Sequence, residues 1–358
     1  MPVFQLLSSP QTYRPCPQNM LVDGEFREHW LTTFAEHFSL IVELAAETYG
    51  PPGREAATRA REAFIAQLAA LRQKPDMLGA LDLEVLGILR EQALRSHGIP
   101  DAFAKMKARE NAAMVPLFSQ VACELDGHSD FSQALLLAVE GAFAGNIFDM
   151  GATATAGMFT DKSPDFFKVR ADVGGKRPWL VDDFDAFTRR MTANPPHQKA
   201  MIFVDNAGSD IVLGIAPLAR LLARRGTRVC LLANSLPSLN DITFQELGPL
   251  LRSLGEQDVE FKRLLSTRRI YAAASGGGTP LIDLRHVSDW CNYEARDADL
   301  VIFQGMGRGL ESNFDAAFTV DAVNMCMIKE RIIAERHHGK VFDVVLRFRP
   351  PSAAAARP

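Results

Sequence analysis

The sequence predicts an α/β fold in which a mostly helical N-terminal domain precedes a domain built on a mainly parallel sheet. Three observations support this prediction. Apolar residues in the N-terminal part recur at helical spacing, without the alternation typical of strands. After Ala200, short apolar runs alternate with segments of helical pattern, as in a parallel sheet with helical crossovers. Several of these apolar runs end abruptly in polar pairs such as Asp205-Asn206 and Asn234-Ser235.

The composition is ordinary for a globular protein and indicates no polymer or lipid partner. The 358 residues are enough for two domains, and 47% are hydrophobic and 23% charged. With a formal net charge of -4, we expect neither a nucleic acid nor a membrane as partner. The five cysteines form no CxxC pair, which favours reduced thiols and a cytoplasmic location. We see neither a signal-peptide pattern nor an apolar run of the ~20 residues that span a membrane.

The N-terminal half consists of helical segments separated by Pro and Gly. After a lead-in rich in Pro, Ser and Gln, helices are expected at about 28–49, through Phe64, Leu68 and Leu71 up to Pro75, and at 79–96, 101–125 and 131–144. Pro51-Pro52-Gly53 separates the first two helices. Pro116 lies inside a predicted helix and should kink or split it. With its lead-in and a connector, this helical domain is expected to span residues 1–185.

The C-terminal half, from residue 186 to 350, alternates between strands and helices. Strands are expected at 200–205, 228–233, 269–274, 299–304 and 341–348. Helices are expected at 210–225, 241–254, 258–266, 285–297 and 321–337. Pro217 should kink the first of these helices or delay its start. The Ala- and Pro-rich residues 351–358 are expected to form a disordered tail.

Polar side chains follow the first two strands of this half. Asp205, Asn206 and Asp210 come after the first strand, and Asn234 and Asp241 come after the second. The carboxyl ends of parallel strands meet at one edge of an open sheet, where ligands bind. A single Asp or Asn there could simply cap a helix or form a turn. Together, carboxylates and amides favour a Mg²⁺ or Mn²⁺ site, whereas no clustered His/Cys set suggests structural zinc.

Three further segments are candidates for substrate binding. The glycines of Gln304-Gly305-Met306-Gly307-Arg308-Gly309 let backbone N–H groups approach an anion, and Arg308 can bind phosphate in a bidentate way. Ser275-Gly276-Gly277-Gly278 is equally consistent with a flexible turn. Asn146 and Asp149, in the segment AGNIFDMGA, mark either a helix–loop joint or part of a pocket. Lys329, on the predicted helix 321–337, has by itself the pattern of a solvated residue.

The order of VDN at 204–206, Asp241 and GMGR at 305–308 resembles the metal-dependent damage-control phosphatases, once catalogued as domain of unknown function 89. The resemblance is to the branch of the plant stand-alone proteins and of the phosphatase domain fused to a pantothenate-kinase-like protein. It runs from the helix 28–49 to the segment that contains Lys329. It implies a helical N-terminal domain packed on a C-terminal α/β/α Rossmann-like domain.

The resemblance implies a role for each matching residue. Asp205, Asn206 and Asp241 would bind a divalent metal ion (Mg, Mn, Co or Ni), and Asp210 would contact the substrate. The phosphate would be held by Gln304, Gly305, Met306, Gly307, Arg308 and Lys329. Asp205, Asp241 and Arg308 are therefore the catalytic candidates.

The implied activity is hydrolysis of small phosphomonoester metabolites, above all 4′-phosphopantetheine or its oxidised, damaged forms. Arg308, Lys329 and the metal would stabilise charge in the transition state. The nucleophile is either water activated at the metal, with Asp205 as base, or a carboxylate that forms an acyl-phosphate. Two residues depart from the family pattern: Gln304 stands where the branch has Glu, and Ala274 stands where Asn is expected.

Two other classes of function stay open. A doubly wound sheet could belong to a nucleotide-dependent oxidoreductase or transferase, but that requires a Gly-rich loop after the first strand. The loop 205–210, DNAGSD, has one glycine. A metabolite-binding protein without turnover is the other alternative, because Gln304 removes a charge from the site. The pattern does not indicate an oligomeric state.

Overall fold

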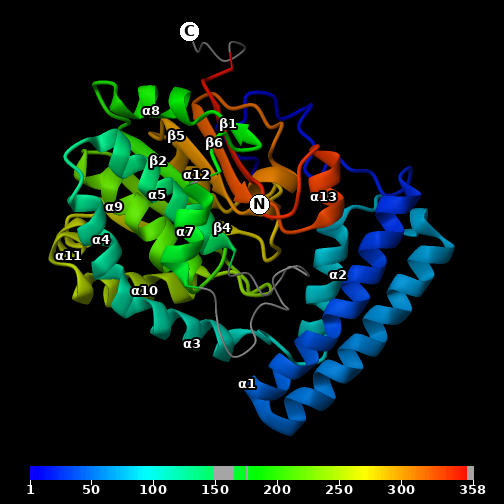
Figure 1. The fold of residues 1–358 in the computed structure, drawn as a ribbon. Coiled ribbons are helices and arrows are strands. Elements are labelled where there is room, and N and C mark those ends of the chain that lie inside the picture. The colour runs from blue at the N-terminus through cyan, green and yellow to red at the C-terminus, as the bar shows by residue number, and fades with distance from the viewer. Residues whose placement is uncertain (148–164, 175, 353–358) are drawn as a thin grey trace.

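The computed structural model describes residues 1–147, 165–174 and 176–352, and its centre is a seven-stranded sheet (Figure 1). The strands are β1 Val181–Asp182, β2 Lys199–Phe203, β3 Arg228–Asn234, β4 Ile270–Gly276, β5 Leu300–Gln304, β6 Asp321–Met327 and β7 Val344–Arg349. Their order in the sheet is β1-β7-β6-β5-β2-β3-β4. All neighbours are parallel except β6 and β7, which confirms the predicted mainly parallel sheet.

Helices precede the sheet in sequence and alternate with its strands, as predicted. The α-helices of the described residues are α1 Gly24–Gln73, α2 Leu83–Ser96, α3 Ala104–Met114, α4 Phe118–Asp126, α5 Phe131–Asn146, α7 Phe166–Gly174, α8 Phe184–Thr192, α9 Ala216–Arg224, α10 Phe244–Gln257, α11 Val259–Ser266, α12 Asp289–Ala295 and α13 Arg331–Arg336. Short 3₁₀ turns are η1 Pro75–Leu78 and η2 Val115–Leu117, and short π-helices are η3 Asp210–Ile215 and η4 Met306–Ser312. This arrangement confirms the predicted α/β fold class.

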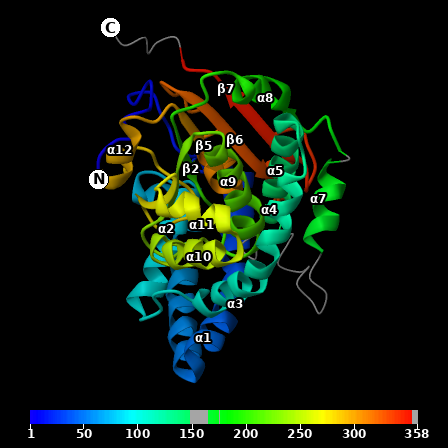
Figure 2. The same cartoon turned by 90° about the vertical axis from the view of Figure 1, so that its left-hand side faces the viewer.

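The two faces of the sheet are covered by different parts of the chain. Successive strand residues point to opposite faces, so Ile202 packs with helices α4, α5, α8 and α9, which lie in front of the sheet in Figure 2. Phe203 packs on the other face against the N-terminal segment, with its ring 5.7 Å from that of Phe4. The lead-in of residues 1–20 therefore forms part of the core.

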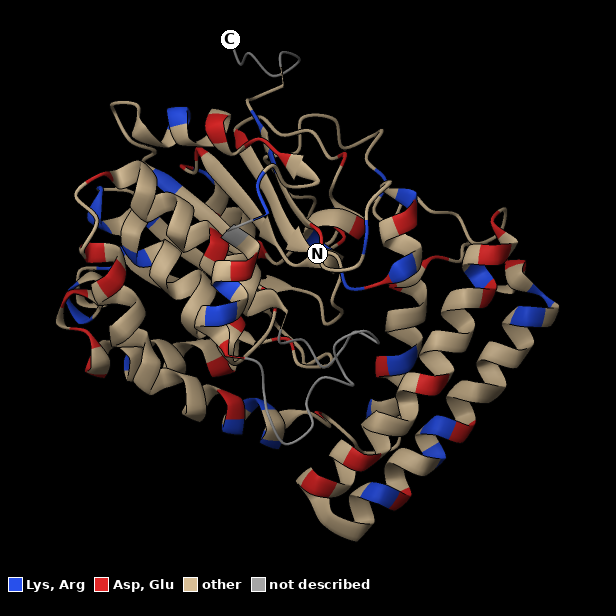
Figure 3. Ribbon diagram, in the orientation of Figure 1, with Lys and Arg blue, Asp and Glu red and all other residues tan. Residues whose placement is uncertain are grey.

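The first helices form a hairpin beside the sheet. Within α1 the backbone of Gly50 has φ 72°, so the chain reverses there and the two arms run side by side (Figure 1). Ion pairs Arg54–Glu43 (2.5 Å) and Arg72–Glu28 (2.9 Å) join the arms, and both signs of charge alternate along them (Figure 3). The predicted break before Pro51 is thereby confirmed. Met306 and Leu310 lie in the same apolar cluster as the buried residues of this hairpin, which places it at the carboxyl ends of the strands.

The predicted helix 321–337 is wrong. Residues Asp321–Met327 form strand β6, residues Arg331–Arg336 form the short helix α13, and Lys329 lies in the loop between them. Every residue of β6 is buried, so the strand lacks the polar–apolar alternation that distinguishes a half-exposed strand from a helix. The short strand β1 was not expected either, because two residues carry no periodic signal.

Both helix-interrupting prolines act as predicted. The chain around Pro116 forms the 3₁₀ turn η2, which separates α3 from α4. Pro217 lies in the first turn of α9, and the six residues before α9 form the π-helix η3. The domain boundary between residues 185 and 186 stays a prediction. Across the described ranges, no helix has the length and apolarity that a membrane crossing requires.

Candidate active site

The carboxyl ends of three neighbouring strands bring the predicted polar residues together. β5, β2 and β3 are adjacent in the sheet, and Gln304 and Asn234 are the last residues of β5 and β3. Asp205 follows β2 by two positions and is 5% exposed. Asn234 Nδ2 donates a hydrogen bond of 3.0 Å to Oδ2 of Asp241. The predicted edge of the sheet is therefore a buried polar site.

Backbone hydrogen bonds join the loops that follow β2 and β3. Asn206 and Asp241 form an isolated antiparallel bridge. The N–H of Ile242 donates to the carbonyl of Asp205 at 3.0 Å, and that of Ala207 donates to the carbonyl of Asn240 at 2.9 Å. The two loops therefore hold Asp205, Asn206 and Asp241, which are distant in sequence, next to one another.

Asp210 is the hydrogen-bond acceptor behind these residues. Its Oδ2 accepts from Nδ2 of Asn146 (2.9 Å), from the backbone N–H of Asn206 (3.2 Å) and from Nδ2 of Asn206 (3.1 Å). Its Oδ1 accepts from Nε2 of Gln304 at 2.7 Å. Asp210 is fully buried and does not line the cleft described below, so its predicted contact with substrate stays a prediction.

Arg308 connects the two candidate metal-binding carboxylates. It lies on η4, is fully buried, and its guanidinium donates to Oδ1 of Asp205 and, at 2.7 Å, to Oδ2 of Asp241. A further bond of 3.2 Å reaches the carbonyl of Pro280. Charge-assisted hydrogen bonds of this kind compensate the loss of hydration of a buried arginine. The carboxylates of Asp205 and Asp241 therefore both contact the guanidinium of Arg308.

Burial opposes ionisation of the carboxylates, whereas the nearby cations favour it. Burial raises the pKa of Asp205 to about 8, with Arg308 and Lys329 opposing this rise and Asp241 adding to it. Burial also raises the pKa of Asp210, against the favourable charge of Lys329 and the hydrogen bonds of Asn146 and Gln304. A cation bound near these groups would stabilise their charged forms.

Two glycines allow η4 to approach the site. Gly305 has φ 99°, and a Cβ on it would lie 2.2 Å from Oδ2 of Asp205. Its N–H donates to the carbonyl of Met325 at 3.0 Å, so the contribution of Gly305 is space rather than a free N–H group. A Cβ on Gly307 would lie 2.7 Å from the carbonyl of Pro280. Met306 and Gly307 line the cleft, as the phosphate-binding prediction requires.

Lys329 reaches the site from a different element than expected. It follows β6, which pairs with β5, and is fully buried. Its charge counteracts the rise in the pKa of Asp205 and of Asp210. The loop after β6 thus places the lysine at the same edge of the sheet, although the helix predicted for it does not exist.

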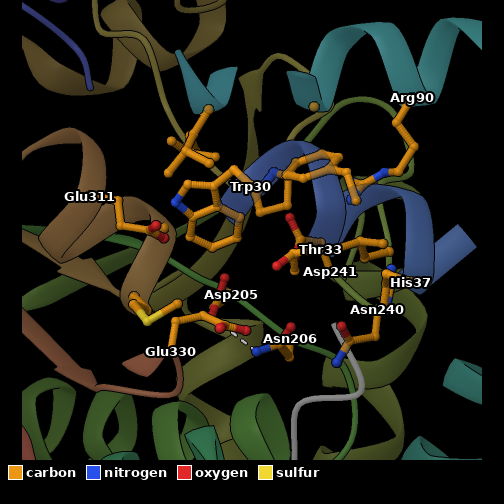
Figure 4. Close-up of a pocket in the computed structure, with 18 residues that line it drawn as sticks. Trp30, Thr33, His37, Arg90, Asp205, Asn206, Asn240, Asp241, Glu311 and Glu330 are labelled. Atoms are coloured by element: carbon orange, nitrogen blue, oxygen red, sulfur yellow. Dashed lines mark hydrogen bonds between the residues drawn. The ribbon is translucent and has the colours of Figure 1, made fainter. Parts of the chain in front are cut away.

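A cleft of about 780 Å³, counting the part open to solvent, lies over this edge (Figure 4). The first helical hairpin supplies Trp30, Thr33, Phe34 and His37, α2 supplies Arg90, and the sheet loops supply Asp205, Asn206, Asn240 and Asp241. Asn240 is 1% exposed, and neither polar atom of its side chain has a hydrogen-bond partner among the described residues. Buried amides are rarely left unpaired, so Asn240 is suited to contact a ligand in the cleft.

Asn146 lies closer to the centre of the site than its sequence pattern indicates, and the residues of the cleft wall were not predicted. Asn146 Nδ2 donates to Oδ2 of Asp205 at 3.1 Å as well as to Asp210. The feature of the sequence that could have indicated this role is the preceding Gly145. A Cβ on Gly145 would lie 2.9 Å from Cα of Asp210, so a glycine is needed for this close approach. Asp149, from the same motif, lies outside the described residues. Nothing in the pattern of α1 distinguished Trp30 from a core residue, because only the packing of the hairpin places it over the site.

The donor set fits a divalent cation of the Mg²⁺ or Mn²⁺ type. Asp205 and Asp241 already converge on the guanidinium of Arg308, and Asn206 lies beside them. Carboxylate and amide oxygens are the ligands such cations prefer. Among the described residues no three His, Cys, Asp or Glu side chains form a ligand group, so the candidate site depends on two carboxylates and an amide.

Fold and site together define a Rossmann-like α/β protein whose strand ends hold paired carboxylates beneath a helical wall. The chain belongs to the family described as damage-control phosphatase ARMT1-like domain, which matches residues 33–345. This finding confirms the family resemblance of the motifs.

Relatives agree with this assignment. The chain is 39% identical to a damage-control phosphatase of Arabidopsis thaliana, with 89% of the chain and 87% of the relative covered. It is 38% identical to pantothenate kinase 2 of Arabidopsis thaliana, covering 98% of the chain and 42% of the relative. It is 29% identical to a mouse 4′-phosphopantetheine phosphatase, covering 97% and 48%. The chain thus spans less than half the length of the last two.

A solved structure shows the same fold. A crystal structure of a DUF89 family protein from Pyrococcus horikoshii superimposes with a TM-score of 0.61, covering 88% of this chain and 95% of that chain. At 18% sequence identity, this similarity concerns the fold alone.

Proposed function

We propose that the protein is a metal-dependent phosphatase that hydrolyses small phosphomonoesters, with 4′-phosphopantetheine or its oxidised forms as the substrate class. The observation that carries the proposal is the convergence of Asp205 and Asp241 on Arg308 at the base of a cleft. The names of two relatives, a damage-control phosphatase and a 4′-phosphopantetheine phosphatase, support the same activity.

Asp205, Asn206 and Asp241 would hold the divalent ion. When bound, this ion would neutralise charge on the phosphate oxygens. Mg²⁺, Mn²⁺, Co²⁺ and Ni²⁺ are the candidates, since all accept oxygen ligands. Asn206 is held in place by its Nδ2, which donates to Oδ2 of Asp205 at 3.0 Å.

The protein's own residues would supply the remaining steps. Arg308 and Lys329, both fully buried, would stabilise negative charge on the transferred phosphoryl group in a site with little water. Asp205, with its raised pKa, would accept a proton from the attacking water or would itself attack phosphorus. Trp30 would contact the leaving group from the helical wall.

The decisive experiment measures phosphate release from 4′-phosphopantetheine and p-nitrophenyl phosphate by chelator-stripped protein, with each metal added back singly. Turnover should appear only with metal, and Asp205→Ala or Asp241→Ala should abolish it while the circular dichroism spectrum is retained. Asp315→Ala is the matched control, because its side chain is 75% exposed, pairs with Arg347 and does not line the cleft. Turnover without metal, or full activity in either site variant, would refute the metal assignment.

One observation keeps a second function in view. Gln304 is neutral and its amide is occupied by Asp205 and Asp210, so the site has one carboxylate fewer than the family branch. A protein that binds phosphopantetheine and metal without turnover would fit this difference. Binding measured by calorimetry, together with the absence of phosphate release for every metal tested, would favour that alternative.

A further inference from the structure

Helix α3 lies beside both loops that bear the candidate metal ligands. In Figure 1 it runs beneath α10, along the lower edge of the molecule and toward the helical hairpin. Its buried residues are Met106 and Lys107, so α3 has a small apolar face. Polar side chains of α3 also contact the two loops.

Lys107 contacts the loop that contains Asp241. Its Nζ donates to the backbone carbonyl of Asp241 at 3.3 Å. It also pairs with Asp101 (2.9 Å) and with Glu246 (2.8 Å), and its side chain is fully buried. Glu246 accepts in turn from the backbone N–H of Thr243 at 2.8 Å, which closes a capping box at the start of α10. The ammonium thus connects α3 to Asp241 and to the start of α10.

Asn111 contacts the other loop. Its Oδ1 accepts a hydrogen bond of 2.7 Å from the backbone N–H of Gly208, between Asn206 and Asp210. Gly208 has φ 76°, and a Cβ there would lie 3.0 Å from Oε2 of Glu110 on the same helix. The loop therefore passes close against α3 in a conformation that suits glycine.

Lys107 and Asn111 are four residues apart, so they lie on one face of the helix, about 6 Å apart along its axis. Each contacts the backbone of one ligand-bearing loop. We propose that Lys107 and Asn111 are positioning residues which set the distance between Asp241 and the pair Asp205-Asn206, and thereby the affinity for the divalent ion. This inference rests on the proposed metal site.

Such a role differs from general stabilisation. The loops are also joined by their own backbone bonds, so we expect loss of one α3 contact to leave the sheet and its core intact. The spacing of the ligands should loosen, because one of its supports is removed. Residues that orient metal ligands from the next layer typically change metal affinity by about 10- to 100-fold when replaced. The expected effect is thus on binding of the ion more than on folding.

The test measures the Kd of Mn²⁺ by calorimetry on the chelator-stripped full chain, together with the Tm of the metal-free protein. Asn111→Leu removes the acceptor at similar size and should weaken Mn²⁺ binding about tenfold. Asn111→Asp retains an acceptor oxygen and should restore binding to within about threefold of the parent. Lys107→Met should weaken binding by at least as much as Asn111→Leu. Arg109→Ala is the matched control, because this residue lies on α3 but pairs with Glu47 and is 61% exposed.

The results separate the inference from the proposed function. The metal site itself is refuted if the parent protein does not bind Mn²⁺, or if Asp205→Ala binds Mn²⁺ as tightly as the parent. If the parent binds and Asn111→Leu binds equally well, or if Asn111→Asp fails to recover, the positioning role is refuted. A fall in Tm with unchanged Kd would also refute it, since that is the result of a merely structural contact. If Lys107→Met does not fold, the Asn111 pair still decides.

Discussion

At the scale of single residues, Gln304 has two partners that require an amide. Its Oε1 accepts from the backbone N–H of Asp205 at 2.9 Å, and its Nε2 donates to Oδ1 of Asp210 at 2.7 Å. A carboxylate could accept the first bond but could donate the second only when protonated. The departure from the family pattern at this position is therefore accommodated by the hydrogen bonds around it.

Replacing Gln304 tests this arrangement. Gln304→Leu leaves two buried partners unpaired and should lower kcat/KM about tenfold or more. Gln304→Glu should stay active at neutral and lower pH, where the new carboxyl and Asp210 share a proton. Its activity should fall as pH rises through the raised pKa of that shared proton, because two adjacent carboxylates repel each other. A pH–rate profile that matches the parent would contradict this account.

Gly305 makes a second prediction at this scale. A Cβ at Gly305 would lie 2.2 Å from Oδ2 of Asp205, and φ 99° is unfavourable for alanine. Gly305→Ala should therefore displace Asp205 and reduce metal-dependent phosphate release at least about 100-fold. Gly277→Ala is the control, since it has φ 71° but no atom within 4 Å of the added Cβ. The control should lose stability through backbone strain and keep its activity; equal loss in both would refute the steric explanation.

At the scale of elements, close packing between α5 and η3 positions the buried polar groups. A Cβ on Gly145 would lie 2.9 Å from Cα of Asp210 and 2.9 Å from the carbonyl oxygen of Ser209. These are backbone atoms, so they cannot move aside as a flexible side chain would. The glycine allows Asn146 to reach Asp205 and Asp210 from a helix that precedes them by about 60 positions in the chain.

Gly145→Ala should therefore separate α5 from η3. We expect a loss of about 1–3 kcal/mol in the free energy of unfolding, together with reduced phosphate release. Gly248→Ala on α10 is the opposite case, because the nearest atom to its Cβ lies 3.9 Å away. That variant should be unchanged or stabilised by up to about 1 kcal/mol. Chemical denaturation of both variants is the measurement, and a stable, fully active Gly145→Ala would show that the contact is not limiting.

Local patterns predicted those elements in which sequence periodicity reflects exposure. The strands at 200–205 and 228–233, and the polar residues after them, were predictable because strand ends meet at one edge of a parallel sheet. Strand β6 was mistaken for a helix because all its residues are buried. The same error moved Lys329 onto a helix, although its place at the end of a strand agrees better with the rule that located Asp205.

At the scale of the whole molecule, the cleft could not be predicted from local patterns. Its base comes from the loops after β2 and β3, and its wall comes from Trp30, Phe34 and His37 on α1 (Figure 4). These parts are about 170 to 210 residues apart in the chain. Amphipathic helices do not reveal which neighbour they cover. The phosphate-binding residues were predicted from the family resemblance. The side chains that can contact a leaving group become apparent only from the packing of α1 over the sheet loops.

The helical wall should therefore determine which phosphomonoesters are accepted. Trp30 lies in the cleft, is 7% exposed, and its Nε1 has no hydrogen-bond partner among the described residues. A substrate whose chain extends along the wall would bury apolar surface against the indole, and each buried CH₂ is worth about 0.8 kcal/mol. A short alkyl phosphate would not reach it. Recognition of the leaving group and of the phosphate would then belong to different parts of the molecule.

Trp30→Leu should consequently raise KM for 4′-phosphopantetheine by about three- to tenfold. The kcat/KM for ethyl phosphate should stay within about twofold, because the phosphate-binding residues are unchanged. Trp290→Phe is the matched control, since Trp290 is 41% exposed on α12 and does not line the cleft. If Trp30→Leu lowered activity equally toward both substrates, the hairpin would act by supporting the sheet loops, and leaving-group selection would have to reside in the loops themselves.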